Sequence, residues 1–200
     1  MYNTVDTIIV GRFVSTRALA AVGTTGPLVN MISGFFTGLS SGATVILAQF
    51  YGANDPKGVD RTLHTGFSLS LILGLLVTAV GCGLGPTILT WMQTPEECLE
   101  MAGTYLRIYF AGSLASMVYN MEAGILRAMG DSRTPVYSLA AACIVNIIMD
   151  IVLVVYGRMG VAGAALATVL SQIISAGMLL VVLLRQRDFP LRFGELCLDG

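Results

Sequence analysis

The sequence predicts an all-α protein: a polytopic membrane helix bundle of about six transmembrane helices, the first of them truncated. Of its 200 residues, 55% are hydrophobic and only 12% are charged, and the mean hydropathy is +0.79. Soluble domains carry about 25% charged residues. Several apolar segments also reach the length of about 20 residues that a bilayer-spanning helix needs. The formal net charge is −1 and no basic cluster occurs, so no nucleic-acid partner is expected. The expected environment of the protein is the lipid bilayer.

The apolar segments form a single transmembrane domain over residues 1–200. We expect spans near residues 1–13, 28–51, 59–85, 96–128, 135–156 and 160–186. The first segment is too short to cross a bilayer, so we expect the chain to begin inside its first helix. Residues 15–26 read as a small-residue connection, with Pro27 at the start of the next helix. Thr94 is expected to cap the fourth span, with Pro95 at its first position.

Three glycines in the second span, Gly34, Gly38 and Gly42, recur every four residues and therefore lie on one face of a helix. Such a stripe lets two helices approach closely. We therefore interpret it as a packing surface for another helix rather than as part of a substrate site.

Basic residues predict the orientation of the chain, because cytoplasmic loops of membrane proteins are enriched in Lys and Arg. One set of loops carries Lys57, Arg61, Arg127, Arg133, Arg185, Arg187 and Arg192. The other set carries Arg12, Arg17 and Arg158, while Arg107 falls within the fourth span. We expect the first set to be cytoplasmic.

Polar residues inside the fifth and sixth spans indicate a functional site. Asp150 lies in an otherwise apolar segment, where an aspartate costs about 2.5–3.5 kcal/mol on insertion scales. Asn146 precedes it by four residues and so points the same way on a helix. Thr168 adds a hydroxyl among small residues of the sixth span. An acid, an amide and a hydroxyl facing one another make a plausible site for a hard cation or a proton.

Two further residues fall at the same predicted depth. At a rise of about 1.5 Å per residue, Asp6 and Asp150 each lie roughly 9 Å from the outer end of their helices. Tyr105 and Thr168 lie about eight residues from the outer ends of theirs. Polar residues on four helices thus converge on one level in the outer half of the membrane.

The remaining polar residues have simpler interpretations. Glu122 and Arg127 lie toward the cytoplasmic end of the fourth span, where charged side chains extend to the interface. His64 is expected at the surface, at the cytoplasmic start of the third span.

Several motifs, in order along the chain, resemble the amino-terminal half of the multidrug and toxic compound extrusion (MATE) family. They are VDTIIVGRFVSTRALAAVG, ILAQFYGANDPK, LRAMGDSRTP, NIIMD and MGVAGAALATVLSQ. The resemblance implies one lobe of a two-lobe, twelve-helix antiporter that expels organic, often cationic, compounds in exchange for Na⁺ or H⁺. By motif position it implies an ion site formed by Asp6, Asn146, Asp150 and Thr168, with Tyr105 and Asp150 at the substrate cleft.

The resemblance covers one lobe only. Transport is therefore expected to need a second six-helix lobe or a second copy of the chain. Two alternatives stay open: a lipid-linked saccharide flippase of the same superfamily, and a non-transporting fragment or assembly partner. An intramembrane aspartyl protease is disfavoured, since no GxGD motif is present.

No enzymatic activity is expected, and the sequence has no phosphate-binding GxxxxGK[ST] loop for ATP hydrolysis. No cofactor is expected apart from Na⁺ or H⁺ as the coupling ion. Short loops favour the plasma membrane of a bacterium (the inner membrane), which the chain would cross several times. Neither the transported compound nor the choice between Na⁺ and H⁺ follows from the sequence.

Overall fold

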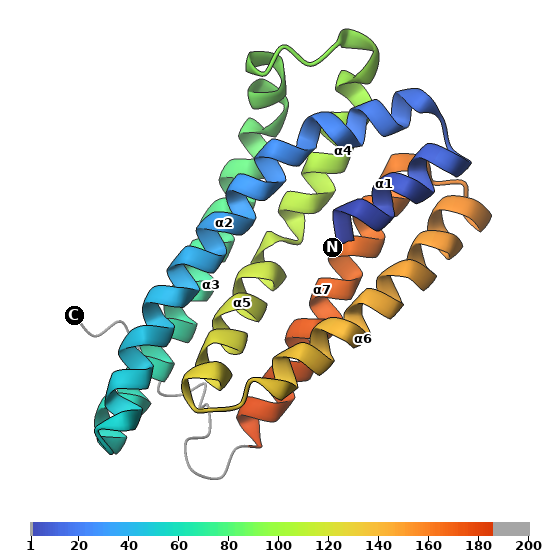
Figure 1. Cartoon of the computed structure of the whole chain (residues 1–200). Helices are drawn as coiled ribbons and strands as arrows, with labels where there is room; N and C mark the ends of the chain where they lie inside the picture. The colour runs from blue at the N-terminus through green and yellow to red at the C-terminus, as the bar shows by residue number, and fades with distance from the viewer. Residues whose placement is uncertain (1, 186–200) are drawn as a thin grey trace.

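A computed structural model describes the backbone of residues 2–185 and the side chains of residues 6–85 and 87–185. Arg187 and Arg192, which were assigned to the cytoplasmic set, lie outside the described residues. Within them every regular element is a helix, and the helices run roughly side by side in an elongated bundle (Figure 1). The all-α fold is confirmed, and in the described part of the chain four helices are long and apolar enough to cross a membrane: 16–52, 56–85, 133–156 and 160–184.

The helices follow one another along the chain with short connections. In order they are α1 (Tyr2–Phe13), α2 (Thr16–Gly52), α3 (Pro56–Trp91), α4 (Glu96–Ala111), α5 (Ser113–Ala128), α6 (Arg133–Asp150), the π-helix η1 (Ile151–Tyr156) and α7 (Gly160–Leu184).

The prediction that Pro27 begins a helix is wrong. Helix α2 starts eleven residues earlier, at Thr16, where the Ser15 side chain accepts a hydrogen bond from the Ala18 amide at 3.1 Å. Pro27 lies inside the helix, and α2 changes direction in its first third (Figure 1). Residues 18, 21 and 22 are buried, so packing against the bundle overrides the break that a proline would otherwise cause.

The predicted fourth span is divided in two by a turn at Gly112. A Cβ atom at Gly112 would lie 2.4 Å from the Val169 side chain of α7, so the turn sits where these helices touch. The predicted cap of this span is also wrong. Pro95 rather than Thr94 occupies the capping position, and no side chain caps the helix.

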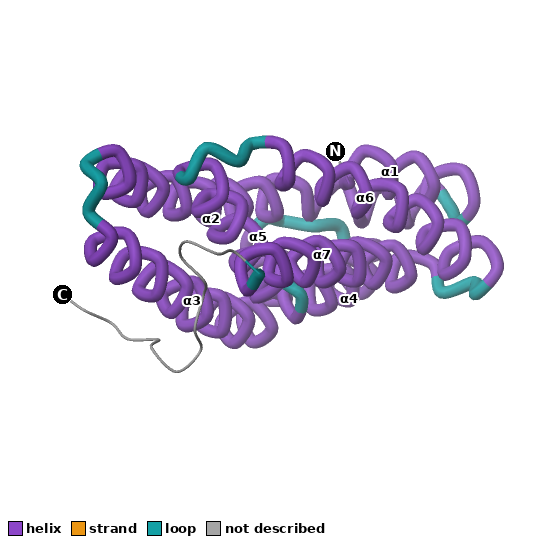
Figure 2. The backbone as a smooth tube through the Cα atoms, turned by 90° about the horizontal axis from the view of Figure 1, so that it is seen from below, coloured by secondary structure: helices purple, strands orange, loops and turns teal. Residues whose placement is uncertain are grey.

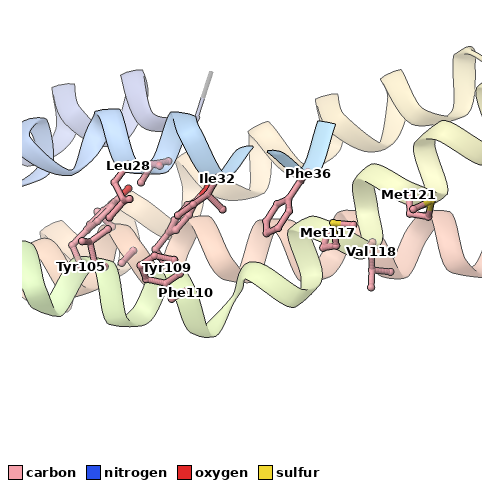
Figure 3. Close-up of a cluster of buried hydrophobic side chains, with 14 of the residues drawn as sticks. Leu28, Ile32, Phe36, Tyr105, Tyr109, Phe110, Met117, Val118 and Met121 are labelled. Carbon is pink, nitrogen blue, oxygen red and sulfur yellow. The ribbon is translucent and has the colours of Figure 1, made fainter. Parts of the chain in front are cut away.

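The interior is apolar along most of the bundle's length. Figure 3 shows Leu28 and Ile32 of α2 directed toward Tyr105 and Tyr109 of α4, and Phe36 farther along α2 on the side of Met117. The same row continues along α5 with Met117 and Met121. These contacts hold the long α2 against the α4–α5 pair.

The basic residues gather as the sequence predicts. The start of α3, the α5–α6 turn and the end of α7 share one end of the bundle, which carries Lys57, Arg61, Arg127, Arg133 and Arg185 (Figure 1). The α1–α2 and α6–α7 turns lie at the other end. We refer to these as the basic end and the opposite end.

Two polar residues are more deeply buried than predicted. His64 is 2% exposed rather than at the surface, because α3 packs against α5 and the imidazole Nδ1 lies 2.8 Å from the Asp60 carbonyl oxygen. Glu122 is fully buried within α5 rather than extended to the interface. Neither carboxyl oxygen of Glu122 has a hydrogen-bond partner among the described residues.

Candidate functional site

Three helices bring predicted site residues together in the interior. Asp6 of α1 is fully buried, and its two carboxyl oxygens face different neighbours. The Thr168 hydroxyl of α7 donates to Oδ2 of Asp6 at 2.6 Å. The Asn146 side-chain amide of α6 donates to Oδ1 at 3.4 Å. Asp6 therefore joins α1 to both α6 and α7 through polar contacts.

Asp150 lies next to this group and is also fully buried. Neither of its carboxyl oxygens receives a hydrogen bond from a described residue. The carboxyl groups of Asp6 and Asp150 are close enough to interact electrostatically. The Thr168 hydroxyl and the Asn146 amide both donate to Asp6, so the two buried acids together retain acceptor capacity for a proton or a cation.

The local backbone around Asp150 is unusual. Asp150 is the last residue of α6, and the six residues that follow form the π-helix η1. Short π-helical turns are rare and occur frequently at functional sites. At Gly163 of α7 a Cβ atom would lie 3.1 Å from the backbone of Leu153, so this glycine lets α7 and η1 approach closely. That approach places Thr168 beside the acids.

Tyr105 of α4 is fully buried and lies within electrostatic range of both aspartates. It also lines a cavity of about 370 Å³ between α1, α2 and α4, together with Thr7, Thr25 and Gly26. Tyr105 thus links this cavity to the acid pair. The structure thus places all five predicted residues in one region.

A second polar pocket, which the sequence analysis missed, lies farther along the bundle. Its volume is about 160 Å³, and its polar lining includes Ser33, Tyr109, Ser116, Asn120 and Gln172. Tyr109 stacks on Tyr105 with ring centroids 6.3 Å apart, and its hydroxyl lies 3.3 Å from that of Ser33. The Ser116 hydroxyl donates to the Gln172 side chain at 2.5 Å.

A sequence signal for this pocket existed. Tyr109 follows Tyr105 by four residues and Gln172 follows Thr168 by four residues, so each continues the face of a predicted site residue. Extending the two faces by one helical turn would have found both.

The main site gathers oxygen atoms of several chemical types in the bundle interior. All of its candidate ligand atoms are oxygens of carboxyl, amide or hydroxyl groups, which suit hard cations and protons. Intramembrane acids that face a bundle interior mark ion or substrate pathways. The fold and the site therefore define a multi-pass helical membrane protein with a buried acidic site.

Comparison with known proteins gives the family. The MatE family model matches residues 1–152. The chain is 32% identical over 93% of its length to the probable multidrug resistance protein YoeA of Bacillus subtilis, of which it covers 41%. It is 33% identical over 86% of its length to YpnP, also a probable multidrug resistance protein of B. subtilis, of which it covers 38%.

Solved structures agree with this result. The crystal structure of MATE in the bent conformation superposes with a TM-score of 0.92, at 29% identity over 97% of this chain and 44% of that one. The chain belongs to the MatE family of multidrug and toxic compound extrusion transporters, as the sequence motifs predicted. It is accordingly a multi-pass membrane protein, as predicted. It spans about two fifths of the length of these relatives.

Proposed function

We propose that this chain forms one lobe of a cation-coupled antiporter that exports organic, often cationic, compounds in exchange for Na⁺ or H⁺. The observation that carries the proposal is the buried acid pair, in which Thr168 and Asn146 hold Asp6 while no described residue donates a hydrogen bond to Asp150. Membership of a family whose relatives are multidrug resistance proteins supports an organic compound as the second substrate.

In this proposal the coupling ion binds between α1, α6 and α7. The Asp6 and Asp150 carboxylates, the Asn146 carbonyl oxygen and the Thr168 hydroxyl offer ligands of the type that hard cations prefer. Among the described residues no three His, Cys, Asp or Glu side chains form a cluster. The donor set therefore fits a monovalent ion or a proton better than a multivalent metal.

Charge neutralisation couples the ion to the exported compound. Two ionised carboxyl groups repel each other strongly where the surroundings are apolar, and a bound cation or proton relieves this repulsion. Relief lets α1 pack more closely against α6 and α7. Because Thr7 and Ile8 of α1 line the cavity beside Tyr105, such a movement narrows the cavity and displaces a bound compound.

A complete cleft needs an opposing wall. The chain corresponds to less than half of the relatives, so in this proposal the other wall comes from a second six-helix lobe or from a second copy. The lobe described here supplies the ion site, since Asp6, Asn146, Asp150 and Thr168 all lie within it.

The test is drug-stimulated ion exchange in proteoliposomes that contain the purified chain, with a fluorescent organic cation inside and a Na⁺ or pH gradient applied. Gradient-driven export that is lost in Asp150→Asn supports the proposal and shows that copies of one lobe complete the cleft. Export by Asp150→Asn equal to that of the wild type would refute the role of the acid pair.

If the wild-type chain exports nothing, the same experiment is repeated with the chain and a separately expressed second lobe of a relative. If the two lobes together export the compound, and Asp150→Asn exports it equally well, the proposal is contradicted.

A further inference from the structure

One buried acid of the bundle takes no part in the main site. Glu122 lies on α5, which runs through the interior of the bundle between α2, α3 and α7 (Figure 2). Its side chain is fully buried, and neither carboxyl oxygen has a hydrogen-bond partner among the described residues. Asp6 is equally buried, but it accepts hydrogen bonds from Thr168 and Asn146. Unlike Asp6, Glu122 therefore forms no polar link between described helices.

The surroundings of Glu122 on α5 are apolar, since Val118, Met121, Ile125 and Leu126 belong to the hydrophobic core. The charged or titratable side chains of α5 and of the helices around it, toward this end of the bundle, include Asp60, His64, Tyr119, Arg127, Arg133 and Arg185. None of them acts electrostatically on Glu122. An ionised carboxylate without a donor or an opposite charge is very costly in an apolar interior, so such a group takes up a proton instead. Glu122 therefore holds a proton while it is buried.

A polar pocket lies within one helical turn of Glu122. It is the pocket of about 160 Å³ whose lining includes Tyr119 and Asn120 of α5. Tyr119 precedes Glu122 by three residues, so the two side chains are neighbours on the helix surface. Long side chains on a helix lean toward its N-terminus. This lean brings the Glu122 carboxyl group toward the pocket.

The pocket offers hydrogen bonds to water. The Ser116 hydroxyl donates to the Gln172 side chain, and the Asn120 side-chain amide donates to the Ser116 carbonyl oxygen at 2.7 Å. The Thr37 hydroxyl, on an exposed residue of α2, lies 3.5 Å from the Asn120 side-chain oxygen. A polar pocket several times larger than one water molecule holds water. Because its wall reaches the surface at Thr37, this water can carry protons between the surface and Glu122.

We propose that Glu122 is a proton-binding site, separate from the acid pair, that exchanges its proton with water in the pocket lined by Tyr119 and Asn120. A metal ion fits this position less well, since hard cations take about six oxygen ligands and the residues around Glu122 on α5 are apolar. A purely structural acid would instead keep its proton sealed from water. The inference concerns Glu122 alone and does not rest on the proposed transport activity.

Infrared spectroscopy of the purified chain tests the proposal. A protonated carboxyl group has its own carbonyl band, which shifts when deuterium replaces the proton in D₂O. We expect a band in the wild type that is lost in Glu122→Gln and kept in Glu100→Gln, which removes an exposed acid. This band should shift after transfer to D₂O. Asn120→Leu makes the pocket wall less polar at similar side-chain volume, and it should slow the shift several-fold. Circular dichroism checks that each variant folds.

A second measurement needs no substitution. A hydrophobic carbodiimide adds to protonated carboxyl groups: the carboxyl proton moves to a carbodiimide nitrogen, and the carboxyl oxygen bonds to the central carbon. The adduct then rearranges to a stable N-acylurea without loss of any atom. We expect mass spectrometry to find one added carbodiimide on the wild-type peptide that contains Glu122.

The proposal is overturned if Glu122→Gln keeps every carboxyl band of the wild type, or if the carbodiimide leaves Glu122 unmodified. A Glu122 band that does not shift in D₂O would also overturn it, since the acid would then be sealed from water. A shift in Asn120→Leu as fast as in the wild type would exclude the pocket as the route and overturn it as well.

Discussion

The hydrogen bond between Thr168 and Asp6 offers a sharp test of the site, because valine replaces threonine with almost the same shape. Thr168→Val removes the hydroxyl that donates at 2.6 Å and leaves Oδ2 of Asp6 buried without that donor. Hydrogen bonds to charged groups contribute about 1.5–3 kcal/mol in soluble proteins. Between membrane helices, measured side-chain hydrogen bonds average about 0.6 and reach about 1.7 kcal/mol.

The short distance and full burial place this bond at the upper end of the membrane range. We expect Thr168→Val to lower the free energy of unfolding by about 1–1.7 kcal/mol, which is roughly a five- to twentyfold change in the folding equilibrium constant. Thr168→Ser keeps the hydroxyl and should recover most of this loss.

The assay is reversible unfolding in mixed micelles, followed by circular dichroism, for a double-mutant cycle of Thr168→Val with Asp6→Asn. A coupling energy of about 1 kcal/mol is expected, because the two residues contact directly. Additive effects of the two substitutions would show that the hydroxyl does not hold Asp6, and the arrangement of the site described above would be wrong.

Three other substitutions test the packing and the charges elsewhere. Gly112→Ala should lower the melting temperature, because its Cβ atom would lie 2.4 Å from the Val169 side chain and overpacking costs about 1–3 kcal/mol. The control Gly103→Ala should leave the melting temperature unchanged, because the space around Gly103 is open. Glu122→Met should raise the free energy of unfolding by about 1–3 kcal/mol, because it removes a buried carboxyl group to which no described residue offers a hydrogen bond. A lower free energy of unfolding in this variant would contradict that reasoning. The Thr134 hydroxyl donates a hydrogen bond to the Asp131 carboxyl, and backbone amides at the start of α6 donate to it as well. These hydrogen bonds hold the pKa of Asp131 below its usual 3.8. Ionised Asp131 therefore contributes its full stabilisation above pH 3.8, and this contribution is lost as the pH falls through the lower pKa of the folded protein. The stability of Asp131→Ala, measured by acid unfolding, should lack this pH-dependent loss.

The sequence predicted the fold well where length and hydropathy decide it. The all-helical bundle and the gathering of basic residues at one end follow from rules that depend on composition alone. The start of α2 did not, because Ser15 and Pro27 are both start signals and the choice between them is made by tertiary contacts of residues 18–22. The depth of His64 likewise depends on which face of α3 meets α5, which no local pattern reveals.

The candidate site was predictable from the cost of placing polar groups in a membrane. Asp150 and Asn146 are recognisable because nothing in an apolar helix requires them, and four-residue spacing puts them on one face. Their contact with Asp6, some 140 residues away, needed the family resemblance or the structure. The π-helix after Asp150 has no signal in the apolar run that forms it.

The proposed role of the acid pair is tested most directly by proton release from the purified chain in a lightly buffered solution. Addition of Na⁺ or of an exported organic cation should release protons from the wild type, because each competes with protons for Asp6 and Asp150. Asp150→Asn should release few or none, while Asp131→Asn should behave as the wild type. Equal release from Asp150→Asn and the wild type, or none from the wild type with either cation, would contradict the assignment of the coupling site to this pair.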